Sequence, residues 1–421
     1  MYVADSRGTP AATPDAARIT SGRRSAVAPT VFALGTVSLI TDVSSEMVTA
    51  VLPLYLVTGL GLSPLGFGLL DGVYNGFSAL VRLLGGHLAD RGGRHKTVAV
   101  LGYGLSALCK PLLLLASSLP VIGAVLAADR TGKGLRTAPR DALISLACAP
   151  ESRGRAFGVH RAMDTAGALL GPLTAFLILR QAADGYDAVF TVSFCVAAVG
   201  VLVLLLFVPS RTATAPAPDA PRPSLKAALA LLRERTVRHL TLAALLLGLA
   251  TVSDSFVYLL LQHRLGVPDR WFALLPLGTA AAFLLLAVPL GRLADKVGRW
   301  QVFLGGHVAL LLAYGLLLTG WQSPALPFLT LALHGGFYAA TDGVLMAAAA
   351  GSVPAGLRSS GLALIQTGQA AARFVCSIAF GAAWTAWGDR TALGTAATAL
   401  TACAVGAFLL RPSTSPKEAR P

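Results

Sequence analysis

Residues 86–96 read Gly-His-Leu-Ala-Asp-Arg-Gly-Gly-Arg-His-Lys, and residues 291–299 read Gly-Arg-Leu-Ala-Asp-Lys-Val-Gly-Arg. Each segment follows a long apolar run and combines an acid with several bases and at least two glycines. That composition is typical of a tight, charged turn at a membrane surface. The two copies begin about half a chain length apart in 421 residues, so the spacing predicts two similar halves.

Composition places the chain in a lipid bilayer. Apolar residues make up 55% of it and charged residues only 13%, and the mean hydropathy is +0.68. A soluble protein of this length needs more polar surface. Apolar runs of about 20 residues recur, and each is long enough to span the bilayer as a helix. We predict an all-α membrane protein with twelve spans, at about 29–57, 65–88, 96–116, 120–147, 155–179, 188–208, 238–262, 270–293, 299–320, 325–350, 358–383 and 389–410.

The polar segments divide these spans into two six-helix bundles. We expect a disordered tail at 1–28, bundles at 29–208 and 238–410, a linker at 209–237 and a second tail at 411–421. A short basic amphipathic helix is predicted at 225–235, inside the linker.

The net charge of +14 comes mostly from bases in short loops, which the positive-inside rule explains better than a nucleic-acid partner does. We therefore expect both termini in the cytoplasm. The single asparagine forms no N-glycosylation sequon, which favours a bacterial inner membrane.

The residues that commonly form catalytic or metal sites are dispersed. The five cysteines stand singly in or beside apolar runs, and the seven histidines show no metal-ligand or nucleophile–base spacing. The sequence thus predicts no enzyme, no metal and no cofactor.

Charged residues inside the predicted spans are the candidate functional residues, because each is costly in a bilayer. The first span carries Asp42 and Glu46, which share a helix face. The fourth carries Asp129, Arg130, Lys133, Arg136, Arg140 and Asp141. We expect Asp42 and Glu46 to pair with Arg130 and with Lys133 or Arg136 across a polar cavity. The alternative is a static ion-pair cluster that only holds the bundle together.

Two acids of the second half, Asp254 and Asp342, have no Lys or Arg within a helical turn. An unpaired buried acid is able to take up and release a proton. The alternative is a hydrogen bond to a neighbouring hydroxyl such as Thr251 or Thr341.

The fifth span contains Gly158, Gly167 and Gly171, the last followed by Pro172, and it also carries Asp164. Glycines four residues apart allow a neighbouring helix to approach closely, and proline kinks the helix. Spacing of this kind mostly indicates helix packing.

From residue 30 to about 410 the chain resembles the major facilitator superfamily, and within it the bacterial drug:proton antiporter-like permeases. The turn at 86–96 is similar to that family's signature between helices two and three, and 291–299 to its weaker copy. Arg130 with Gly134 resembles the fourth-helix signature of proton-coupled members. The glycine spacing of the fifth span resembles the antiporter signature. Residues 41–46 and 132–141 resemble a subgroup of mostly unassigned permeases.

The resemblance implies alternating access, in which two bundles rock about a site on the first, fourth, seventh and tenth helices. It also implies a conformational latch at the charged turns, formed by Gly86, Asp90, Arg91, Gly93, Arg94, Asp295 and Arg299. The alternative is that Asp90 only caps its turn. We expect a monomer that exports a small organic molecule in exchange for protons. A proton symporter importing a nutrient or organic anion is the alternative, and a non-transporting membrane sensor is a remote one.

Overall fold

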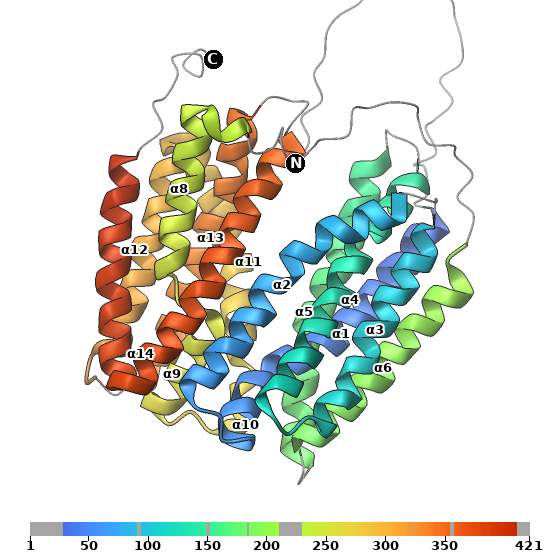
Figure 1. Ribbon diagram of the computed structural model, residues 1–421, viewed down its shortest axis with the longest axis horizontal. Helices are drawn as coiled ribbons and strands as arrows, with labels where there is room; N and C mark the ends of the chain where they lie inside the picture. The colour runs from blue at the N-terminus through green and yellow to red at the C-terminus, as the bar shows by residue number, and fades with distance from the viewer. Residues whose placement is uncertain are drawn as a thin grey trace, which may run out of the picture.

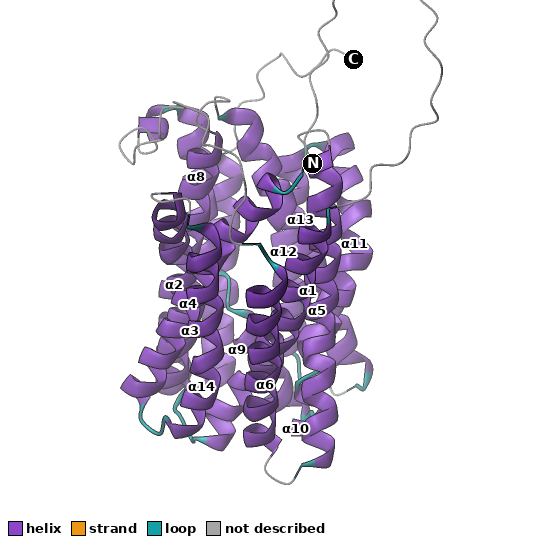
Figure 2. Ribbon diagram, turned by 90° about the vertical axis from the view of Figure 1, so that its right-hand side faces the viewer, coloured by secondary structure: helices purple, strands orange, loops and turns teal. Residues whose placement is uncertain are grey.

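A computed structural model describes residues 28–90, 94–148, 152–182, 185–209, 230–321, 323–353 and 358–410. Every regular element in these ranges is helical (Figure 2). The first half forms α1 (Pro29–Leu54), which continues as a short π-helix (Tyr55–Gly59), then α2 (Pro64–Asp90), α3 (His95–Leu115), α4 (Leu119–Leu146), α5 (Arg153–Gln181) and α6 (Gly185–Phe207).

The second half begins with a 3₁₀ turn (Leu231–Arg233), where we expected the end of the amphipathic helix; residues 210–229 lie outside the described ranges. It continues with α8 (Arg235–Ala250), α9 (Asp254–Leu265), α10 (Asp269–Phe272), α11 (Leu275–Val297), α12 (Arg299–Leu318), α13 (Ala325–Ser352) and α14 (Arg358–Leu409). Gly388, at a φ of 80°, turns the chain within α14, between the two spans expected there. The tails at 1–27 and 411–421 are likewise outside the described residues.

Eight helical stretches of the described chain meet the length and hydropathy of a membrane span, and one of them, Leu364–Leu409, contains the turn in α14. The remaining long helices, α2, α4 and α13, have 27 or 28 residues each. At about 1.5 Å per residue they also exceed the ~30 Å hydrocarbon core. The charged residues noted above lower the hydropathy of α4.

The helices form two groups, α1–α6 and α8–α14 (Figure 1). The groups approach each other at one end of the molecule and diverge toward the other end, where α1 begins and α14 ends. At the closed end, the Leu65 amide of α2 donates to Thr385 Oγ1 of α14 over 3.0 Å, and the rings of Phe176 and Trp271 lie 5.1 Å apart.

Glycines allow α2 and α14 to cross in backbone contact. A Cβ added to Gly68 would meet the Ser377 carbonyl, and one added to Gly381 would meet the Pro64 carbonyl. One turn further along α2, Gly72 faces Phe374. Because no side chain separates the backbones, the two bundles meet along this crossing.

Glycines likewise bring α5 against α1. A Cβ on Gly167 would meet Leu39 and Asp42, and one on Gly171 would meet Val43 and Glu46. The close approach therefore places the two acids of α1 directly over α5. Gly158 differs, because nothing lies within 4 Å of its added Cβ.

The seventh span, expected over 238–262, is one apolar stretch at Arg235–Arg264, but its helix is broken: α8 ends at Ala250 and α9 begins at Asp254. Between them, the backbone N–H of Val252 donates to the hydroxyl of Tyr314 on α12 over 2.8 Å. A buried hydroxyl thus replaces a helical hydrogen-bond acceptor, and it stabilises the break in the membrane interior. Sequence periodicity alone does not show a partner from another helix.

Candidate functional site

A cavity of about 360 Å³ lies between the two groups of helices. Residues of α1, α2, α9, α11, α13 and α14 line it, together with the break between α8 and α9. Its polar lining consists of Glu46, Thr49, Tyr74, Asn75, Thr251, Ser253, Asp254, Ser255, Tyr258, Thr279, Tyr338, Asp342 and Arg373. Three of the predicted pathway acids, Glu46, Asp254 and Asp342, are among them.

Asp254 occupies the first turn of α9, at the break. Its Oδ1 accepts a hydrogen bond from the hydroxyl of Tyr338 and lies 3.4 Å from Nε2 of His334, whose side chain is only 1% exposed. Neither threonine proposed as a partner bonds to an acid, since Thr251 donates to the Leu247 carbonyl and Thr341 to that of Phe337.

Asp342 faces the same cavity from α13. It makes no hydrogen bond or short ion pair with any other residue that the structure describes. Arg373 of α14 is the one base in the described lining, and its guanidinium carbon lies 5.8 Å from the centre of the Tyr338 ring. The cavity wall therefore carries more carboxyl groups than bases.

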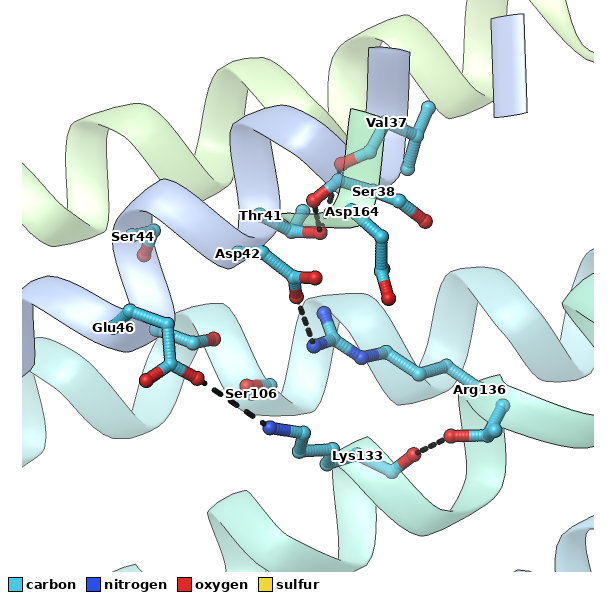
Figure 3. A network of polar contacts seen from close by, with 12 residues as sticks. Val37, Ser38, Thr41, Asp42, Ser44, Glu46, Ser106, Lys133, Arg136 and Asp164 are labelled. Atoms are coloured by element: carbon cyan, nitrogen blue, oxygen red, sulfur yellow. Dashed lines mark hydrogen bonds and ion pairs between the residues drawn. The ribbon is translucent and has the colours of Figure 1, made fainter. Parts of the chain in front are cut away.

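The acids of α1 pair with bases of α4 (Figure 3). Asp42 Oδ1 lies 3.4 Å from Arg136 Nη2, and Glu46 Oε1 lies 3.8 Å from Lys133 Nζ. The Arg136 side chain is only 4% exposed, and it also stacks on the Tyr103 ring at 4.5 Å.

Arg130 was expected to pair with an acid of α1, and here the structure differs. Its guanidinium bonds to Oδ2 of the adjacent Asp129 and lies 3.8 Å from the centre of the Tyr74 ring. Asp129 Oδ1 in turn accepts from Ser106 Oγ (2.6 Å) and Lys110 Nζ (3.1 Å) of α3. These buried charges form a closed cluster within the first group of helices.

Lys110 was not singled out from the sequence. A lysine inside an apolar run was a usable signal, because such a residue needs a partner or water at membrane depth.

Asp164 of the fifth span joins another cluster, in which its Oδ1 lies 3.6 Å from Arg140 and its Oδ2 lies 3.3 Å from Arg161. Figure 3 shows the Asp164 carboxyl directed toward Asp42 and Arg136.

The predicted latch is only partly described. Gly86 and Asp90 lie in the last turn of α2, where the structure describes the backbone alone, and Arg91 and Gly93 lie outside the described residues. Arg94 is exposed and precedes α3. In the second copy, Asp295 and Arg299 form a loose pair at 3.9 Å between α11 and α12.

The five free cysteines are dispersed, and the described residues contain no group of three His, Cys, Asp or Glu side chains able to hold a metal ion. A polar cavity between two bundles of membrane-spanning helices is the architecture of a secondary transporter.

Comparison with known proteins identifies the family. Residues 34–375 match the model of the Major Facilitator Superfamily. An uncharacterised MFS-type transporter of Methanocaldococcus jannaschii is 31% identical over 349 residues, covering 80% of this chain and 84% of that protein. An uncharacterised protein of Mycobacterium tuberculosis is 37% identical over 152 residues, covering 36% and 37%. The chain belongs to the Major Facilitator Superfamily, whose members are carriers rather than enzymes.

Solved structures share the fold. The nucleoside transporter NupG superposes with a TM-score of 0.77 at 14% identity, covering 90% of this chain and 98% of that one. A bacterial homologue of the lysosomal transporter Spinster, inward-facing and unoccupied, gives 0.74 at 16%, covering 90% and 96%. The peptide transporter POT gives 0.75 at 16%, covering 91% and 94%. The predicted fold class, two pseudo-symmetric six-helix bundles, is confirmed.

Proposed function

We propose that this transporter exports a small organic cation in exchange for protons, by alternating access to the central cavity. The observation that carries the proposal is the excess of carboxyl groups without a Lys or Arg partner, those of Asp254 and Asp342, over the single base Arg373 in the described lining. Glu46 also lines the cavity but is paired with Lys133. These carboxylates attract a cation electrostatically in a region of low dielectric. The hydroxyl and amide groups around them offer hydrogen bonds to a polar substrate.

Competition for the same carboxylates supports exchange rather than cotransport. A carboxyl group that binds a proton is neutral and attracts a cation far less strongly, so proton and substrate exclude each other. A carrier that alternates between the two ligands moves them in opposite directions. With protons entering down their gradient, the substrate leaves the cell.

The alternative, proton-coupled import of an organic anion, was suggested by the bases of the fourth helix. Lys133 and Arg136 are paired with Glu46 and Asp42, and Arg130 with Asp129. Paired bases offer less net positive charge to an anion.

The positive-inside pattern also supports a location in the cell membrane with both termini cytoplasmic, and the cavity then opens to the cytoplasm.

The test uses purified protein in liposomes with an imposed pH gradient. Tetraalkylammonium ions of increasing size serve as cation probes because their charge does not titrate, and dicarboxylates serve as anion probes. We expect a tetraalkylammonium gradient to drive proton movement in the opposite direction. Proton flux in the same direction as a dicarboxylate would establish symport, and the absence of flux with every probe would contradict the proposal.

Asp254→Asn is expected to lower the rate of cation-driven proton flux by about 10- to 100-fold. The variant replaces a charged hydrogen-bond acceptor, a change worth roughly 1.5–3 kcal/mol, with a neutral one. The matched control is Asp389→Asn in the same bundle. Asp389 lies outside the cavity lining and contacts His263 (3.3 Å) and Arg264 (3.9 Å). Equal rates in Asp254→Asn and the wild type would exclude Asp254 from the substrate site.

A further inference from the structure

Asp71 of α2 is a buried acid that the proposed site does not use. Only 4% of the residue is exposed, although it lies at the contact between the two bundles. Its Oδ2 accepts a hydrogen bond of 2.7 Å from Ser377 Oγ of α14, so the contact crosses from one bundle to the other. The glycine crossing of Gly68 with Gly381 lies one turn away, toward the closed end.

No base neutralises this carboxyl group among the residues that the structure describes. Three serine side chains face it, those of Ser377, Ser253 and Ser255. Two titratable side chains also lie near it, Asp254 of α9 and Cys376 of α14. The other charged groups of the surrounding helices make no ion pair with it; these are Glu46 of α1, Lys110 of α3, Asp129 and Arg130 of α4, and Arg373 of α14. A buried carboxylate without a base is costly, and the protonated form avoids that cost.

Asp71 also lies close to the central cavity. It lines a small cavity of about 20 Å³, roughly the volume needed for one water molecule. This cavity shares Thr49, Pro53, Tyr74 and Ser255 with the central cavity. Thr49, Tyr74 and Ser255 therefore place polar groups on the wall that the two cavities share.

We propose that Asp71 is a proton-dependent latch between α2 and α14, which holds the bundles together at the closed end when it is protonated and releases them when it ionises. The inference rests on one part of the proposed function, namely that the transporter opens alternately at its two ends. When the closed end opens, α2 must separate from α14, and Asp71 then meets water on that side. Closing this end again buries the carboxyl group and requires it to bind a proton.

The direction of the pH effect follows from linkage. The closed arrangement binds the proton more tightly than the separated one, so it is favoured at low pH and lost as the pH rises. For one linked proton, the ratio of separated to closed molecules rises by at most about tenfold per pH unit. Other carboxyl groups, those of Glu46, Asp254 and Asp342, line the central cavity nearby, so the assignment to Asp71 needs a variant at that position.

The experiment measures the distance across the closed end by double electron–electron resonance, between about pH 5 and about pH 9. Spin labels are placed at Ser63→Cys and Ala386→Cys, both exposed and close to the Leu65–Thr385 hydrogen bond, after replacement of the five native cysteines. In the wild type we expect the separated population to grow with pH. In Asp71→Asn, which is neutral but still accepts the Ser377 hydrogen bond, we expect the closed distance throughout.

Ser377→Ala is the matched control. It removes the hydrogen bond and keeps the acid, so we expect fewer closed molecules but a distance that still depends on pH. A pH-independent distance in the wild type, or a wild-type response in Asp71→Asn, would overturn the latch. The measurement needs no substrate, and therefore its failure is distinguishable from failure of the proposed cation export.

Discussion

Asp42→Arg and Arg136→Asp are each expected to destabilise the protein severely, and the double variant is expected to recover most of the loss. The Arg136 side chain is almost fully buried, and Asp42 is its partner at 3.4 Å. Removing one member of a buried pair leaves an uncompensated charge and typically costs about 3–5 kcal/mol. Exchanging the two charges restores the attraction, although the stacking of Arg136 on Tyr103 is lost, so recovery will be incomplete.

The unfolding midpoint in detergent and the proton flux in liposomes are the two measurements. Arg161→Gln is the control, because that side chain is 78% exposed in its contact with Asp164 and an exposed pair contributes only about 0–1 kcal/mol. If the double variant is no more stable than the two single variants, the pairing across α1 and α4 does not hold the bundle together. Recovered stability without recovered flux would assign the pair a direct role in transport.

Gly171→Leu is expected to lower both the stability of the protein and its proton flux. Its added side chain would meet the Val43 carbonyl and Glu46 Cβ, and the backbone of α1 cannot move aside as a flexible side chain does. Overpacking of this kind typically costs about 1–3 kcal/mol, which is a large fraction of the free energy of unfolding of a native protein. Because Glu46 lies over this glycine, we also expect the proton flux to fall beyond the loss of folded protein.

Gly158→Leu is the matched control on the same helix. Nothing lies within 4 Å of an added Cβ there, and leucine has a higher helix propensity than glycine by up to about 1 kcal/mol. We expect an unchanged or slightly higher unfolding midpoint and unchanged flux. A Gly158→Leu variant that folds normally but transports as poorly as Gly171→Leu would show that the glycine spacing of α5 does more than pack helices.

The charged residues illustrate what spacing along one helix indicates. Asp42 and Glu46 share a face of α1, and bases at Lys133 and Arg136 meet them from α4 at the matching depth. The sequence could not choose among the bases of the fourth helix, because several lie within reach of the same two acids. The pairing predicted for Arg130 was wrong because Arg130 forms an ion pair with its own neighbour, Asp129, which also pairs with Lys110 of α3.

The sequence by itself determined the membrane class, the repeated halves, the approximate ends of the spans and the helices that carry charge. All of these follow from the cost of placing polar groups in hydrocarbon, which acts on each segment separately. The tertiary structure alone decided the break before Asp254, the partner of each ion and the contact of Asp71 with Ser377. Those features depend on which helices lie side by side, and a side chain from a distant helix, such as Tyr314 at the break, leaves no periodic mark in the segment it stabilises.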